Sequence, residues 1–180
     1  MDDLTRTAII AQFGAALRML RLAMEQCPDD LWDDRGEGAP FWQTAYHTLY
    51  VCDLYLSDSP DAFTPPPFHV EHANLFAGEY PWLPTRVAPP SCVLPKARLL
   101  EYQLHCWEKC KTMAGAMTAA RASERCGFFW YDLNVLELLL LNLRHVQHHS
   151  GQLIAVLRRR ADTGIPWVGR VENPENPNEP

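Results

Sequence analysis

The chain has 180 residues, of which 47% are hydrophobic and 21% charged; this excludes an intrinsically disordered protein and is ordinary for a globular one. A chain of this length is most simply one domain with a full hydrophobic core. Its formal net charge of −6 argues against broad binding to nucleic acid or to an anionic membrane, because both favour a positive surface.

The N-terminal stretch does not have the pattern of an export signal. MDDLTRTAII is acidic where a secretory signal is basic, and no apolar signal segment follows it. The leucine run LELLLLNL is too short to cross a bilayer. The six cysteines include no C-x-x-C pair, so we expect reduced thiols packed as small apolar groups. These features predict a cytoplasmic protein.

Four segments carry the periodicity of amphipathic helices, and we expect them to form an all-α four-helix bundle. Pro40 suits the first turn of the second helix, and Asp132 is a candidate N-cap for the fourth. Three arginines, residues 158–160, would complement the C-terminal end of that fourth helix. The predicted helices cover residues 4–27, 40–57, 95–117 and 133–160.

A long connection, residues 58–95, separates the second and third helices. It holds nine prolines from Pro60 to Pro95, so it is not helical, and it is long for a connection within one domain. Such a crossover frees the two helices it joins from being antiparallel neighbours. Its aromatic residues indicate that it packs against the bundle as a lid or wrap: Phe63, Phe68, Phe76, Tyr80 and Trp82.

The domain is expected to span residues 1–170. The last ten residues, VENPENPNEP, are rich in proline, asparagine and glutamate and are expected to be a disordered tail.

The stretch NLRHVQHHSGQL places three histidines within five positions of the predicted fourth helix. Residues four apart on a helix differ by about 40° in direction and about 6 Å in height, so His145 and His149 can converge on one ion. A catalytic ion needs about three protein ligands, and His47 in the second helix is the candidate for the third. His148, at the i, i+3 spacing from His145, is an alternative to His149.

The alternative interpretation from spacing alone is that these histidines are hydrogen-bonded core residues. A lone buried histidine such as His47 is more often a satisfied polar group than a ligand, and H-x-x-x-H without a neighbouring glutamate is only moderately specific. Several nearby side chains could orient a ligand or substrate, or could equally be polar groups satisfied within the core: Gln43, Tyr50, Asn142 and Gln152. Gly151 would be explained if another helix backbone approached it closely.

The stretches PFWQTAYHTLYVCDLYLS and LRHVQHHSGQL together resemble the DinB-like family of bacterial four-helix proteins, also known as YfiT-like metal-dependent hydrolases. The family pattern is one histidine in the second helix and H-x-x-x-H in the fourth, followed by Gly-Gln. The resemblance covers about residues 4–160, although only these two helices carry specific motifs. The matching residues here are His47, His145, His149, Gly151 and Gln152.

This resemblance implies a bundle that runs up-down-down-up, with a divalent ion between the second and fourth helices. It also implies that Ser150 is a departure, since members often have arginine before the Gly-Gln. Three neutral imidazoles suit zinc or nickel best, with iron, manganese or copper as alternatives. Relatives of the family frequently pair, so a homodimer is a further expectation.

The resemblance implies two activities, because the family includes bacillithiol and mycothiol S-transferases beside hydrolases. We favour transfer of a low-molecular-weight thiol to a small-molecule substrate, since the metal can activate the thiol without a protein base. Hydrolysis needs a general base, which the crossover could supply from His69, Glu71 or His72 if it folds over the site. A bundle that binds a metal or small ligand without turnover, or a purely structural bundle, are the remaining alternatives.

Overall fold

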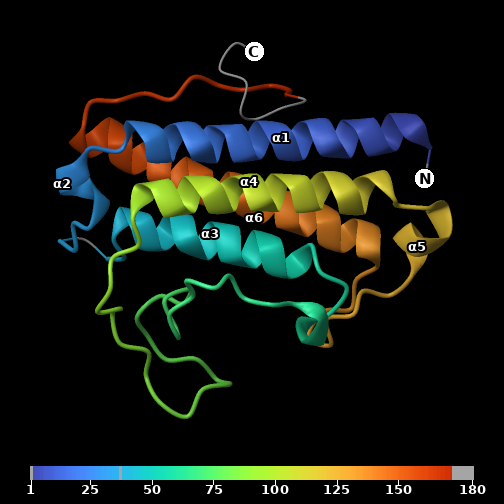
Figure 1. Cartoon of the computed structure of the whole chain (residues 1–180), viewed down its shortest axis with the longest axis horizontal. Coiled ribbons are helices and arrows are strands. Elements are labelled where there is room, and N and C mark those ends of the chain that lie inside the picture. The colour runs from blue at the N-terminus through green and yellow to red at the C-terminus, as the bar shows by residue number, and fades with distance from the viewer. Residues whose placement is uncertain (1, 37, 172–180) are drawn as a thin grey trace.

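The computed structural model describes residues 2–36 and 38–171, and this part of the chain is helical without a β-strand. Four long helices lie side by side (Figure 1): α1 (Asp3–Gln26), α3 (Phe41–Tyr55), α4 (Lys96–Gly115) and α6 (Val135–Arg160). Two short helices, α2 (Asp29–Trp32) and α5 (Ala119–Ser123), and a 3₁₀ turn at Pro60–Ala62 occupy the connections. The predicted all-α four-helix bundle is confirmed.

The four long helices form a square in which α1 and α3 each pack against both α4 and α6. In Figure 1, α1 and α6 run in one direction while α3 and α4 run in the other, which is the up-down-down-up order. The neighbours α3 and α4 are therefore parallel, and α3 and α6 are antiparallel. Parallel neighbours cannot be joined by a tight turn, which accounts for the long crossover between them.

Two helix starts agree with the proline signals, and one predicted cap is wrong. Pro40 and Pro95 immediately precede α3 and α4 as their N-cap residues. Helix α6, in contrast, is capped by Asn134 and not by Asp132. The Asn134 side chain accepts from the Glu137 N–H at 2.8 Å, and the Glu137 carboxylate accepts from the Asn134 N–H at 2.9 Å. This capping box satisfies two backbone donors at once, which an aspartate two residues earlier cannot do.

Helix α1 supplies much of the core through Phe13, Leu17 and Leu20, all fully buried. The same helix is long and apolar enough to cross a membrane, with a mean hydropathy of 1.2, but 67% of the window that meets this test is buried within the bundle. Its apolar surface is thus used in packing against α4 and α6. This is the usual situation for a core helix.

The crossover packs along α3 for part of its length (Figure 1). Gln43 donates to the Leu75 carbonyl oxygen at 2.6 Å, and Ala73 is fully buried beside it. Phe63 makes an edge contact with Tyr50, with ring centroids 5.1 Å apart. The expectation that the crossover wraps against the bundle is therefore confirmed here, through three of the five aromatic residues: Phe63, Phe68 and Phe76.

The other two aromatic residues of the crossover do not follow this expectation. Tyr80 and Trp82 contact each other with tilted rings whose centroids are 5.1 Å apart, and Trp82 is 69% exposed. They lie in a loop, residues 78–87, that is closed by an isolated bridge between Gly78 and Val87.

All six cysteines are free thiols, and five are buried. Burial raises the pKa of both Cys106 and Cys110, so each is a protonated core side chain. The end of the described chain is also part of the core. Val171, the first residue of the predicted tail, is buried, and its N–H donates to the Ala11 carbonyl at 3.4 Å. The rest of the predicted tail, residues 172–180, lies outside the described residues.

Gly151 does not mark a close approach between helices, and that expectation is wrong. A Cβ placed on Gly151 would meet nothing within 4 Å, whereas one on Gly127 would lie 2.1 Å from the Asp58 carbonyl oxygen. Gly151 is an exposed position inside α6.

We predict that Gly151→Ala raises the free energy of unfolding by about 0.5–1 kcal/mol, because alanine loses less backbone entropy in a helix. Gly127→Ala should lower it by about 1–3 kcal/mol, since the methyl group can fit only if the Asp58 backbone moves. Urea denaturation of the two variants beside the wild type measures both changes. Loss of stability in Gly151→Ala would show that the position is more crowded than the structure indicates.

Candidate metal centre

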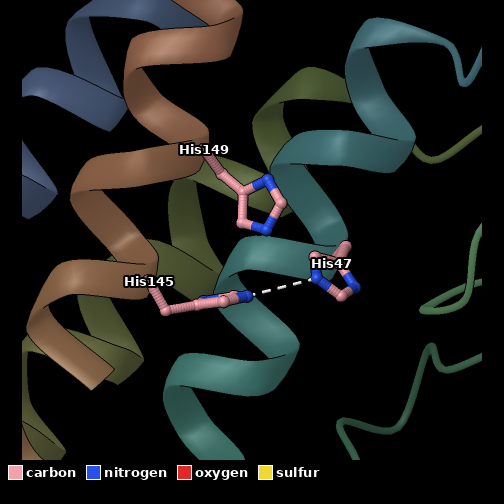
Figure 2. A group of neighbouring side chains, drawn as sticks. All are labelled: His47, His145 and His149. Carbon is pink, nitrogen blue, oxygen red and sulfur yellow. Dashed lines mark hydrogen bonds between the residues drawn. The ribbon is translucent and has the colours of Figure 1, made fainter. Parts of the chain in front are cut away.

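Three histidines from two antiparallel helices meet at one point of the bundle (Figure 2). His47 lies in the middle of α3, while His145 and His149 lie one turn apart on α6. Nitrogen atoms from the three rings lie within 4.8 Å of one another. The closest pair is His145 Nε2 and His47 Nε2, 3.2 Å apart. It is the only group of three or more potential ligand side chains found in the described part of the chain.

Two of the rings are held by hydrogen bonds from their outer nitrogen atoms. His47 Nδ1 lies 2.8 Å from the Asn74 carbonyl oxygen, and His149 Nδ1 lies 2.7 Å from Gln152 Oε1. A carbonyl oxygen only accepts, so each Nδ1 carries the proton and donates it. Each Nε2 is left with a free lone pair, and Figure 2 shows the second ring nitrogen of His149 directed toward the other two rings. The hydrogen bonds thus select the tautomer that a metal ligand requires.

His145 completes the group but leaves an unsatisfied atom in either neutral form. Its Nδ1 is buried and has no hydrogen-bond partner. If Nε2 carries the proton, it can donate to His47, and a lone pair at Nδ1 stays buried without a donor. If Nδ1 carries it, the lone pairs of two Nε2 atoms face each other at 3.2 Å. A cation between the rings would remove that repulsion, so the three imidazoles fit a divalent ion.

The electrostatics of the site keep the imidazoles neutral. Burial lowers the pKa of His145 to about 3, helped by repulsion from the His149 and His47 rings. Burial lowers the pKa of His149 to about 4, again with repulsion from His47. The pKa of His47 is also lowered by burial, although its hydrogen bond to Asn74 opposes the shift. Neutral imidazole is the form that binds metals.

The four predicted supporting side chains have different roles. Gln152 alone is hydrogen-bonded to a histidine of the cluster. Gln43 bonds to the crossover backbone at Leu75, next to Asn74, and therefore helps to hold the carbonyl that orients His47. Tyr50 packs against aromatic rings of the crossover and makes no recorded contact with the cluster. Asn142 donates to the Cys52 carbonyl oxygen at 3.0 Å, and its own Oδ1 is buried without a partner.

The third histidine of the sequence cluster, His148, lies outside the candidate site. It is exposed, and its Nε2 lies 3.1 Å from Gln152 Nε2. Since the amide nitrogen of Gln152 donates to His148 while its oxygen accepts from His149, the two histidines fix the orientation of one amide. The geometry therefore places His149, and not His148, among the candidate ligands.

The residues of the crossover that contact the histidine cluster are not the three that the sequence offered as a general base. His69 instead bonds to the Tyr46 hydroxyl at 2.7 Å, and the side chains of Glu71 and His72 are 88% and 43% exposed. None of these three is in contact with the cluster, so the crossover does not supply the general base that hydrolysis would need. Phe76 does contact it, with its ring centroid 4.6 Å from that of His47.

Comparison with known proteins agrees with this arrangement. A family model described as the DinB superfamily matches residues 12–153, which include all three histidines of the cluster. The chain therefore belongs to the DinB superfamily. No curated protein and no solved structure matches it.

The depressed pKa values predict that the metal-free protein loses stability in mild acid. In the unfolded chain the histidines take up protons near pH 6.5, while in the folded chain His145 and His149 stay neutral until about pH 3 and 4. Between these limits the unfolded state binds more protons, so stability falls as pH falls, by at most about 1.4 kcal/mol per pH unit for each histidine.

Urea denaturation of chelator-treated protein at pH 7, 6, 5 and 4 measures this slope. The double variant His145→Gln, His149→Gln should show a flatter dependence, because glutamine does not titrate. His72→Asn is the matched control: it removes an exposed histidine, and asparagine tolerates the positive φ of 63° at that position. An unchanged slope in the double variant would contradict the burial of these rings.

Proposed function

We propose that this protein is a metal-dependent enzyme in which His47, His145 and His149 hold one divalent ion, and that it transfers a low-molecular-weight thiol to a small electrophilic substrate. The observation that supports this most is the convergence of three Nε2 lone pairs whose opposite nitrogens are fixed at two of the three rings. Membership of the DinB superfamily is compatible with such an enzyme.

The donor set narrows the choice of metal ion. Three neutral nitrogen donors with open positions suit zinc or nickel, and also iron, manganese or copper, and leave the ion its full positive charge. When bound, such an ion supplies Lewis acidity, which lowers the pKa of a thiol or a water molecule.

Thiol transfer fits the surroundings of the cluster better than hydrolysis. No carboxylate belongs to the cluster in residues 2–36 and 38–171, so no general base stands ready beside it. Thiol transfer requires only that the thiol lose its proton. Hydrolysis requires both the activation of a water molecule and the protonation of a leaving group. Hydrolysis and metal binding without turnover are therefore outcomes that the activity test distinguishes.

The protein's own residues orient the ligands and limit the access of water. Asn74 and Gln152 accept the Nδ1 protons of His47 and His149. The His145 Nδ1 has no such acceptor in this structure, and we propose that Asn142 takes this role when an ion is bound. Its Oδ1 and the His145 Nδ1 are both buried and unpaired, and the two residues lie three apart on α6. Phe76 covers the His47 ring on the crossover side and presents an apolar surface to the site.

We place this reaction in a reducing compartment, the cytoplasm, because all six cysteines are free. The negative net charge again favours a small-molecule substrate over nucleic acid or membrane. Pairing of two copies is an additional proposal that gel filtration can test.

We predict one bound divalent metal ion per chain in the purified wild type, measured by elemental analysis. His47→Ala should abolish stoichiometric metal, because two imidazoles alone leave the ion weakly held. Asn142→Leu should weaken the affinity by about tenfold to a hundredfold if its oxygen orients His145.

His72→Asn, which changes an exposed histidine outside the site, should retain the metal. A wild-type protein that carries no first-row metal and takes none up on addition would overturn the proposed metal centre.

For the reaction, we predict that the metal-loaded wild type accelerates the conjugation of a thiol to chlorodinitrobenzene, followed by absorbance. His145→Ala should reduce this rate to that of the metal-free protein, while His72→Asn leaves it unchanged. A panel of thiols and ester substrates run in parallel separates the activities: ester cleavage without conjugation would favour a hydrolase. Neither reaction above the rate of His145→Ala would favour a protein that binds metal without turnover.

A further inference from the structure

A small cavity of about 110 Å³ lies between α3 and α6, and its lining includes Gln152, which is hydrogen-bonded to His149. Part of its lining is apolar, formed by Leu31, Ala39, Phe41, Leu153 and Val156. The rest is polar and charged: Asp34, Thr44, Gln152, Arg159 and Arg160. The cavity therefore combines an apolar wall with a basic end, which suits an amphipathic organic anion better than a water molecule or a wholly apolar group.

The end of the cavity formed by Thr44 and Gln152 lies one helical turn from the candidate ligands on both helices. Thr44 precedes His47 by three residues on α3, and Gln152 follows His149 by three residues on α6. Each step is about 4.5 Å along the helix axis. Gln152 belongs to both places, since it lines the cavity and accepts the His149 Nδ1 proton. A molecule in this cavity could therefore extend to the histidine cluster.

The charges at the outer end are only partly neutralised. Arg160 pairs with Asp34, and the carboxyl of Asp34 has a lowered pKa because of the Gly36 N–H and of Arg160, so it stays ionised. Arg159 makes no ion pair with a carboxylate in the described residues and also lines the cavity. Its guanidinium is available to a ligand carboxylate, with which arginine can form two parallel hydrogen bonds.

We propose that this cavity binds the anionic arm of the substrate, with a carboxylate on Arg159 and an aliphatic segment along α6 toward the histidine cluster. This inference rests on the proposed function and names its substrate class, a small organic acid. Arg159 follows Gln152 by seven residues, or about 10 Å of helix, and Gln152 lies one further turn from His149, so the carboxylate and the reacting group should be separated by a chain of several carbons.

Cobalt-loaded protein tests this proposal with defined probes. 6-Mercaptohexanoate and 6-mercaptohexanol have the same length and differ only in the carboxylate, and a thiol that binds cobalt is followed by its charge-transfer absorbance. The wild type should bind the carboxylate probe about tenfold more tightly. 3-Mercaptopropionate should show no such preference over 2-mercaptoethanol, because it is too short to span the two turns.

The variants use two adjacent arginines. Arg159→Gln should lose the preference for the carboxylate, while Arg158→Gln should keep it, since both arginines are exposed but Arg158 does not line the cavity. Both variants change the net charge equally, so the comparison removes any general electrostatic effect. Equal binding of the two probes by the wild type, or the same loss in both variants, would overturn the proposal.

The same experiments distinguish failure of the proposed function from failure of the proposed anion site. If cobalt binds but neither thiol alters its spectrum, thiol chemistry at the site is excluded. The cavity is then measured by calorimetry with hexanoate against hexanol. A preference for hexanoate that Arg159→Gln removes and Arg158→Gln retains would still support the anion site, and no preference would end it.

Discussion

The candidate site depends on one electrostatic constraint, the mutual approach of imidazole lone pairs inside a helix bundle. His47 and His149 each donate a hydrogen bond from Nδ1 to a carbonyl oxygen. Their Nε2 atoms therefore carry no proton and cannot donate. His145 then has no arrangement that satisfies both of its nitrogens. Buried polar atoms without partners are uncommon and usually have a functional reason. An ion shared by the three rings is the simplest explanation for the unpaired nitrogen of His145.

The topology of the bundle and the composition of the site have a common cause. Parallel packing of α3 beside α4 requires the chain to return along the length of the bundle, and the returning segment contacts α3 on the way. That segment supplies the Asn74 carbonyl oxygen and the Phe76 ring, both in contact with His47. The crossover is thus part of the site and not only a connection, although its exposed loop at Trp82 takes no part.

A buried ionic cluster holds the C-terminal end of α3 against α4. Asp53, which is 2% exposed, accepts hydrogen bonds from Tyr102 and from Lys109, both on α4. A buried ion pair contributes little net stability because of desolvation, but one with a single good geometry can define how two helices align. Since α3 also carries His47, such alignment would contribute to the position of the histidine relative to α6.

The sequence by itself determined the four long helices, the wrapped crossover and the set of histidines. Local periodicity, proline positions and the i, i+4 spacing of His145 and His149 depend only on neighbours along the chain, so they can be read without a fold. The cap of α6 at Asn134 is also a local signal, since Glu137 follows it by three residues, and the prediction of Asp132 overlooks that signal.

Only the tertiary structure decided which atoms meet. The choice of His149 over His148 depends on the rotation of α6 against α3, and the bond from Asn74 depends on where an irregular segment lies. The path of the crossover also keeps Glu71 and His72 away from the histidine cluster. The cavity beside Arg159 arises from side chains of three separate segments. Such contacts join residues far apart in the chain, where no local pattern constrains distance, and packing of the whole bundle determines them.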